Sequence, residues 1–197
     1  MRYPLLCLIT AMGLGLLQGC AAPSVAAGVG TKVGSSTQAM ITAADRRSAT
    51  TLVEDDAIES KSKKRIDEVF KDAVHVNVTA YNHFALITGS APNEKVKMDI
   101  ERIVGSIPNV KGIANEIVVS DTPVNASATS DTRLTASVKY RFIKSPAFKA
   151  NNVIVVTENS VVYLMGLVTR AEADAASDIA STTAGVQKVV RVFEYID

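Results

Sequence analysis

Residues 152–169, NVIVVTENSVVYLMGLVT, decide the fold, because residues 77–92, NVTAYNHFALITGSAP, repeat their pattern 77 positions earlier. In both copies two runs of apolar, β-branched residues flank an Asn, which is Asn82 in the first copy and Asn159 in the second. Asn adopts positive φ at little cost, so each copy predicts a β-hairpin with a tight turn. The chain therefore contains an internal duplication, and the rest of each repeat is expected to pack on its hairpin.

The first repeat predicts a helix, two strands, a helix and a last strand. Asp55 and Asp56 are expected to cap the first helix, whose apolar residues recur at helical spacing as far as Val69. After the hairpin, residues 94–106 show the same helical spacing, and residues 113–119 have the composition of a strand.

The second repeat restates this order. Asp131 is expected to cap a helix that buries Leu134, Val138 and Phe142 and that ends before Pro146. The elements expected after it are strands at 153–157 and 160–169, an Ala-rich helix at 171–183 and a strand at 189–195.

These patterns predict an α+β fold built from two tandem domains. Each would be an αββαβ unit, with a three-stranded mixed sheet and two helices on one face. The boundaries expected from the sequence are residues 55–120 and 131–197, with a polar linker at 121–130. Gly89 and Gly166 fall in the middle of strands, where we expect a helix to cross closely.

The N-terminus has the features of an export signal. An apolar run follows Arg2 and ends in Leu17-Gln18-Gly19-Cys20, which resembles the lipobox of bacterial lipoproteins. We expect residues 1–19 to be removed, Cys20 to carry lipid, and residues 20–54 to form a flexible tether rich in Ala, Gly, Ser and Thr. Because Ala21 follows the cysteine, the resemblance implies delivery to the outer membrane, facing the periplasm.

Composition argues against several classes of function. A net charge of +1 gives no basic excess for nucleic acid. His75 and His83 are the only histidines, and their spacing fits surface residues better than a metal site. No phosphate-binding loop or nucleophile elbow is present. We therefore expect no catalytic residue, metal or cofactor.

With both repeats laid out, the sequence resembles the dual BON-domain outer-membrane lipoproteins of the DolP-like type along nearly its whole length. The first repeat carries the weaker form of the pattern, with Asp55-x-x-Ile58, Val78, Ala85-x-Ile87-x-Gly89 and Val110-x-x-Ile113. The second repeat carries the fuller one, with Asp131-x-x-Leu134-x-x-x-Val138, Val155, Asn159, Val162-x-Leu164-x-Gly166-x-Val168 and Gly185-Val186-x-x-Val189.

The resemblance implies a non-enzymatic protein that binds anionic phospholipid through the first helix of its second domain. It also implies a role in envelope integrity, a place at the division site, and support of outer-membrane protein assembly. This chain departs from the family at Arg133, where an aromatic residue is expected two positions after the Asp. Arg can still hold a phosphate by a bidentate contact.

The candidate phospholipid-binding residues lie on the exposed face of the helix at 132–144, and they are Arg133, Tyr140, Arg141 and Lys144. Such a cationic face can equally be solvated surface. The basic stretch at 61–65 in the first repeat is the next candidate. The competing class of function is a periplasmic protein-interaction module without lipid recognition.

A second apolar face is expected on the hairpin of the second repeat, formed by Val161, Tyr163, Met165 and Leu167. A sheet with helices on one side normally shows polar residues on the other. This face is therefore expected either to dock on the first domain or to bind a partner.

Overall fold

The computed structural model describes residues 45–120 and 128–197, which lie within one compact unit that begins at residue 34. The expected signal peptide, Cys20, most of the expected tether and most of the expected linker lie outside the described residues.

The first repeat folds in the expected order. Its elements are α2 (Ala49–Phe70), the short helix η1 (Lys71–Ala73), β1 (His75–Tyr81), β2 (Phe84–Ala91), α3 (Glu94–Gly105), β3 (Gly112–Asn115) and β4 (Val118–Val119). β2 lies in the middle of the sheet, antiparallel to β1 and parallel to both β3 and β4. The last strand is therefore interrupted, where the sequence predicted one run at 113–119, because Ile117 turns into the core.

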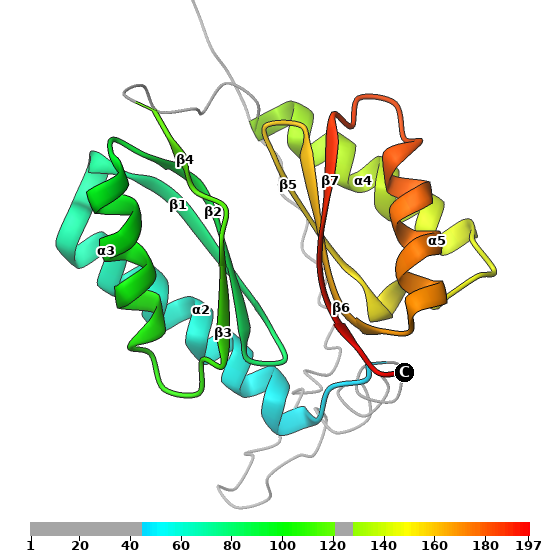
Figure 1. Cartoon of the computed structure of the whole chain (residues 1–197), viewed down its shortest axis with the longest axis horizontal. Helices are drawn as coiled ribbons and strands as arrows, with labels where there is room; N and C mark the ends of the chain where they lie inside the picture. The colour runs from blue at the N-terminus through cyan, green and yellow to red at the C-terminus, as the bar shows by residue number, and fades with distance from the viewer. Residues whose placement is uncertain (1–44, 121–127) are drawn as a thin grey trace, which may run out of the picture. The chain divides into compact units, whose positions relative to one another are not determined.

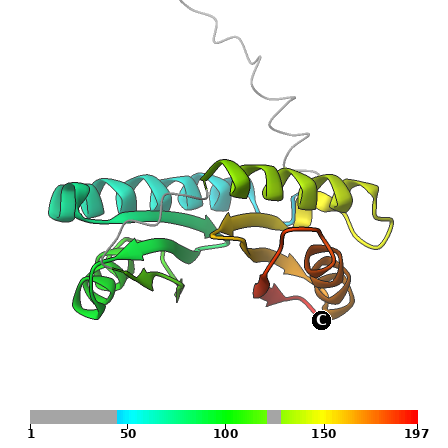
Figure 2. The same ribbon diagram turned by 90° about the horizontal axis from the view of Figure 1, so that it is seen from above.

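The second repeat has the same plan with an unbroken last strand. Its elements are α4 (Ala128–Lys144), η2 (Ala150–Asn152), β5 (Ile154–Glu158), β6 (Val161–Val168), α5 (Arg170–Ser181) and β7 (Lys188–Tyr195). The sheet order is β5-β6-β7, antiparallel then parallel. In each repeat the two long helices cover one face of the sheet (Figures 1 and 2). The predicted pair of αββαβ units is confirmed.

The expected helix caps are wrong, and the correction shows what the two aspartates do. α2 begins at Ala49, capped by the Ser48 side chain, so Asp55 lies within the helix and is only 2% exposed. Its carboxylate accepts hydrogen bonds from the backbone N–H of Asn82 at 2.8 Å and of His83 at 2.7 Å. Asp55 therefore holds the hairpin turn instead of capping the helix.

In the second repeat, a buried aspartate again accepts hydrogen bonds from the hairpin turn. α4 begins at Ala128, and the buried Asp131 accepts from the backbone N–H of Asn159 at 2.8 Å and of Ser160 at 2.9 Å. Both residues of each turn have positive φ, between 51° and 69°. Two successive residues in this region define the type I′ turn, which matches the twist of the flanking strands. The predicted role of Asn82 and Asn159 is confirmed.

The two mid-strand glycines meet a backbone, but it is not that of a helix. A Cβ on Gly166 would overlap the carbonyl oxygen of Asn152, and one on Gly89 would overlap that of His75. In each repeat the obstructing carbonyl belongs to the segment at the start of the neighbouring strand. The expected helix crossing is therefore wrong, and the close approach lies within the sheet.

Each repeat has its own core on the helical face of its sheet. Ile58, Ile87 and Ile100 are almost fully buried in the first, and Val138, Leu164 and Ala176 in the second. The Ala-rich α5 lies close against its sheet, as expected, because its inward residues are small.

The open faces of the two sheets share a third cluster, in which Tyr163, Met165 and Leu167 pack with Tyr81 and Leu86. The second apolar face of the hairpin was expected either to dock on the first domain or to bind a partner. The structure shows the first of these. Burial raises the pKa of Tyr163 to about 12, and the negative charges of Glu116 and Glu158 add to the shift.

Residues 45–47, expected as part of the tether, make specific contacts with both repeats. Arg46 donates to the Leu167 carbonyl at 2.6 Å and to both carboxylate oxygens of Glu172 at 2.7 and 2.8 Å. Arg47 pairs with Asp55 at 2.8 Å and lies 4.0 Å from the centre of the Tyr81 ring. The hydrogen bond from Arg46 is the main reason that the pKa of Glu172 is lowered.

Candidate functional site

Helix α4 divides cleanly into a buried stripe and an exposed face. Leu134, Val138 and Phe142 are at most 8% exposed, as the sequence predicts, and Val138 and Phe142 belong to the second core. The ring of Phe148 meets that of Phe142 edge-on, with 5.0 Å between the ring centres. These three residues therefore serve folding, which leaves the opposite face of the helix free for function.

Three of the four predicted binding residues lie on that exposed face. Arg133, Tyr140 and Lys144 are exposed, and the Lys144 amine lies 5.5 Å from the centre of the Tyr140 ring. Arg133 precedes Tyr140 by about two helical turns, so it points to the same side. Ile143, which was not among the predicted residues, is 71% exposed beside them, next to Tyr140 at 61%.

The fourth predicted residue, Arg141, has a different role. Its guanidinium donates to the Ile179 carbonyl at 2.6 Å, the Thr183 hydroxyl at 2.6 Å and the Thr182 hydroxyl at 3.0 Å. All three acceptors lie at the C-terminal end of α5, where backbone carbonyls lack partners and a cation is stabilising. Arg141 thus joins α4 to α5, and its donors point away from the exposed face.

Replacing Arg141 by Ala is expected to lower the free energy of unfolding by about 1.5–3 kcal/mol, because charge-assisted hydrogen bonds between α4 and α5 are lost. Urea denaturation measures the change. The matched control is Lys139→Ala, at an exposed position of the same helix, which should change stability by less than about 0.5 kcal/mol. Equal stability of the two variants would contradict the structural role.

Charge separates α4 from the other candidate, the basic stretch of α2. α4 carries four cationic side chains and one carboxylate, that of the buried Asp131. α2 carries four cationic side chains and six carboxylates, and Lys63 and Lys64 pair with Asp67 and Glu68 one turn on. Among the described residues, no salt bridge engages Arg133, Lys139 or Lys144. α4 therefore carries an excess of positive charge, whereas α2 carries an excess of negative charge.

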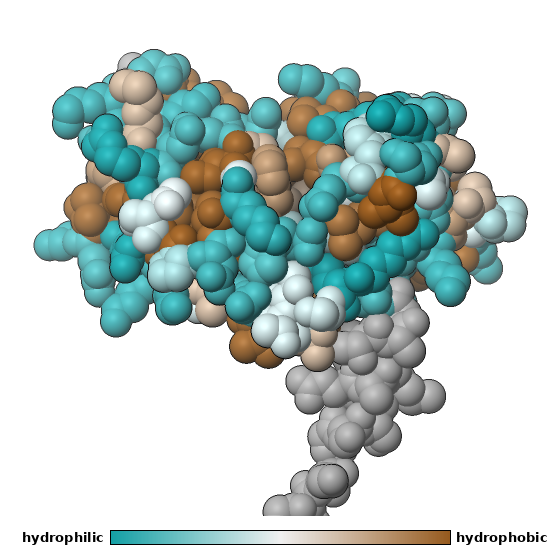
Figure 3. All heavy atoms as spheres, turned by 60° about the horizontal axis from the view of Figure 1, so that its bottom comes forward, coloured by the Kyte–Doolittle hydropathy of each residue, from teal (hydrophilic) through white to brown (hydrophobic). Residues whose placement is uncertain are grey.

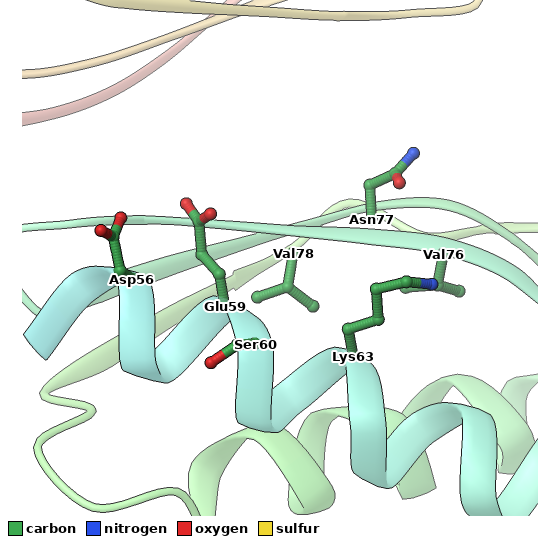
Figure 4. Close-up of a pocket in the computed structure, with 7 residues that line it drawn as sticks. All are labelled: Asp56, Glu59, Ser60, Lys63, Val76, Asn77 and Val78. Carbon is green, nitrogen blue, oxygen red and sulfur yellow. The ribbon is translucent and has the colours of Figure 1, made fainter. Parts of the chain in front are cut away.

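A groove of about 370 Å³ lies between α2 and β1, lined by Asp56, Glu59, Ser60, Lys63, Val76, Asn77 and Val78 (Figure 4). Glu59 accepts a hydrogen bond from the backbone N–H of Ala80 at 2.8 Å. Burial, reinforced by neighbouring carboxylates, raises the pKa of Glu59. Two carboxylates and one amine make this groove a poor match for an anionic headgroup.

The two histidines lie apart in different settings. His75 is exposed at the start of β1, whereas His83 is buried in the turn with Nε2 2.7 Å from the Glu54 carboxylate. No cluster of three or more His, Cys, Asp or Glu within the described ranges could hold a metal ion. No helix in those ranges has the length and apolar character needed to cross a bilayer.

Comparison with known proteins agrees with this architecture. The family model described as BON domain matches residues 54–121 and again residues 130–197. The two matches coincide with the two repeats and together span most of the chain.

Two curated relatives match the chain over most of its length. It is 35% identical over 184 residues to "Outer membrane lipoprotein DolP" of Haemophilus influenzae, covering 92% of this chain and 91% of the relative. It is 32% identical over 154 residues to "21 kDa hemolysin" of Actinobacillus pleuropneumoniae, covering 77% and 79%. A Chlamydia trachomatis type III secretion protein, CdsD, aligns over 67% of this chain and 96% of its own with 12% identity, but the TM-score is only 0.29.

Proposed function

Because the chain belongs to the BON-domain family, as a DolP-like protein with two copies of the domain, we propose that it is a non-enzymatic outer-membrane lipoprotein that binds anionic phospholipid through α4. The observation that carries the proposal is the exposed face of α4, where Arg133, Tyr140, Ile143 and Lys144 combine unpaired cations with apolar side chains.

Each part of this face suits a different layer of a membrane surface. Arg and Lys side chains near an anionic surface contribute on the order of 1 kcal/mol each, by attraction to the headgroup phosphates. Tyr140 and Ile143 can reach below the phosphates, since an aromatic ring with a polar tip and an aliphatic side chain both favour that boundary. A lipid anchor would hold the domain near the surface, so modest attraction gives high occupancy.

The proposal is tested by floating residues 34–197 with liposomes. The fragment should float with phosphatidylglycerol liposomes and not with phosphatidylcholine, and the binding should weaken as salt rises. The double variant Arg133→Glu/Lys144→Glu should bind at least about tenfold more weakly, because two attractive charges become repulsive. Circular dichroism checks that the variant is folded.

The matched control is Lys63→Glu/Lys64→Glu, which makes the same charge change on α2. It should leave flotation unchanged, since both lysines are already paired. If this control abolishes binding and the α4 variant retains it, the membrane surface is α2 and the assignment to α4 is wrong.

Membrane attachment in this proposal depends on Cys20. We expect the mature protein to begin at Cys20 with lipid on its thiol and amine, because residues 17–20 resemble a lipobox. Mass spectrometry of the mature N-terminus measures the modification. The Cys20→Ala variant should remain unprocessed or leave the membrane fraction, and an unmodified Cys20 in the mature protein would contradict the prediction.

The wider role follows from the family resemblance. We extend the proposal to envelope integrity at the division site, with the outer-membrane protein assembly machinery as a partner. A fluorescent fusion should gather at midcell, and the Arg133→Glu/Lys144→Glu variant should lose that pattern while it remains anchored. If the variant keeps the pattern, recognition of a protein partner accounts for localisation better than lipid binding does.

A further inference from the structure

The outer edge of β7 is the longest unguarded strand edge of the two sheets. β7 pairs with β6 along one side over eight residues, in unbroken parallel register. Within residues 45–120 and 128–197, no strand pairs with its other side. An edge of this kind presents a row of backbone donors and acceptors that can pair with another chain.

The corresponding edge of the first repeat is closed by its local structure. β3 has four residues and β4 two, and between them Ile117 is 2% exposed in the core. The Asn115 side chain accepts from the Ile117 N–H, which fixes the break in the strand. Breaks and short strands are common ways to prevent edge pairing, and β7 has neither.

The edge strand β1 is guarded in another way. The Glu59 side chain reaches from α2 and occupies the N–H of Ala80. The chain thus protects two edges of the first sheet while it leaves β7 continuous. The two repeats share one order of elements, so the interrupted last strand of the first repeat and the continuous β7 of the second can be compared directly.

An apolar slot of about 460 Å³ runs beside β7. Val190 and Val192 of β7 form one wall, and Phe84 and Ala114 of the first sheet lie on the other. Phe84 is 36% exposed, and its ring lies over Gly112, where a Cβ would overlap it. The slot continues the shared cluster of the two sheets. On the face shown in Figure 3, hydrophobic residues form exposed patches that are surrounded by hydrophilic residues.

Carboxylates set the charge of the slot. Glu116 and Glu194 line it, together with Arg191, whose guanidinium pairs with Asp174 at 2.7 Å. Glu194 also accepts a hydrogen bond from the Asn82 side-chain amide at 2.7 Å. A ligand that carries a cation next to apolar groups would complement these walls.

We propose that β7 binds an extended segment of another polypeptide, which joins the sheet as an added strand. Its backbone pairs with the open edge of β7, alternate apolar side chains enter the slot, and one Lys or Arg meets Glu116 and Glu194. Main-chain pairing supplies the affinity in this mode of binding, and the pockets for alternate side chains supply the specificity. This surface is separate from the exposed face of α4, so it acts independently of the proposed lipid binding.

The test uses the mature full-length protein in zwitterionic detergent micelles and a fluorescent decapeptide, Thr-Val-Thr-Val-Thr-Lys-Thr-Val-Thr-Gly, whose Lys lies on the same face of the strand as its Val residues. Fluorescence anisotropy should give a Kd below about 1 mM. A control peptide with the same side chains and N-methylation at alternate residues should bind at least about tenfold more weakly, because it cannot pair as a strand. No binding up to that concentration, or equal binding of both peptides, overturns the proposal.

Variants locate the site. Ala114→Phe should fill the slot and weaken peptide binding at least about tenfold, whereas Ala136→Phe, at an exposed position of α4, should not. If Ala114→Phe fails to fold, Glu116→Lys/Glu194→Lys replaces it and should shift the preference from the Lys peptide to one with Glu at that position. Unchanged binding by the slot variants, or dimerisation of the protein through β7 without peptide, assigns the edge to another role and overturns the proposal.

Discussion

Replacing Asp55 by Ala is expected to lower the free energy of unfolding by about 3–5 kcal/mol, because one buried carboxylate serves three donors. The backbone N–H groups of Asn82 and His83 lose their acceptor, and Arg47 loses its partner at 2.8 Å. Each buried donor left without an acceptor costs its own desolvation penalty. The turn with two residues at positive φ then lacks the contact that holds it against α2.

Urea denaturation measures this loss, and Asp56→Ala is the matched control. Asp56 is the adjacent residue in α2 and is exposed, so its replacement should change stability by less than about 0.5 kcal/mol. The helix content of both variants should stay similar, since neither residue caps α2. A loss confined to the first turn of α2 in the Asp55 variant would instead restore the role of helix cap.

The order of elements could be predicted from sequence because it depends on local patterns. The alternation of apolar residues and the Asn in each turn predict the hairpins, and the duplication lets one repeat check the other. Helix ends were less predictable, because the first turn of α2 lies in a stretch whose Ala and Thr residues match the composition of the expected tether. No sequence pattern marked Ser48 as the N-cap of α2, whereas the Asp55-Asp56 pair matched the pattern of a helix start.

The roles of single polar residues could not be predicted, because their partners are distant in sequence. Arg141 bonds to α5 some 40 positions later, and Arg46 bonds to Leu167 across 121 positions. Asp55 reaches a turn 27 and 28 positions away. In each case the residue type suggested a local or solvent-facing role. Only the packing of helices on the sheet brings the partner within reach.

The sequence pattern contains a signal for Ile143, which was not among the predicted residues. It lies one turn from Tyr140 and outside the buried stripe of Leu134, Val138 and Phe142. A large aliphatic residue on the polar face of an amphipathic helix is a signal for a membrane or protein contact. Val69 shows that apolar spacing alone does not ensure burial. It follows the apolar spacing of α2 but is 61% exposed at the end of that helix.

The substitution Gly89→Ala is expected to cost about 3–5 kcal/mol, since it combines backbone strain with a clash against main chain. Gly89 has φ of 119°, a conformation that residues with a side chain rarely adopt. An added Cβ would overlap the carbonyl oxygen of His75 and lie 3.0 Å from the Cα of Val76. Val76 pairs with Gly89 across the hairpin, so relief of the clash requires β1 to move away from β2.

Gly105→Ala is the matched control for Gly89→Ala, because it makes the same chemical change without backbone strain or a clash with the main chain. Gly105 ends α3, and a Cβ there would lie 3.5 Å from the Ile113 side chain, an ordinary contact. Ala favours helix over Gly by up to about 1 kcal/mol, so this variant should match or exceed the parent in stability. Thermal denaturation of both variants decides the matter: if Gly89→Ala melts with the parent, the strands adjust at little cost and the glycine is not required for the hairpin.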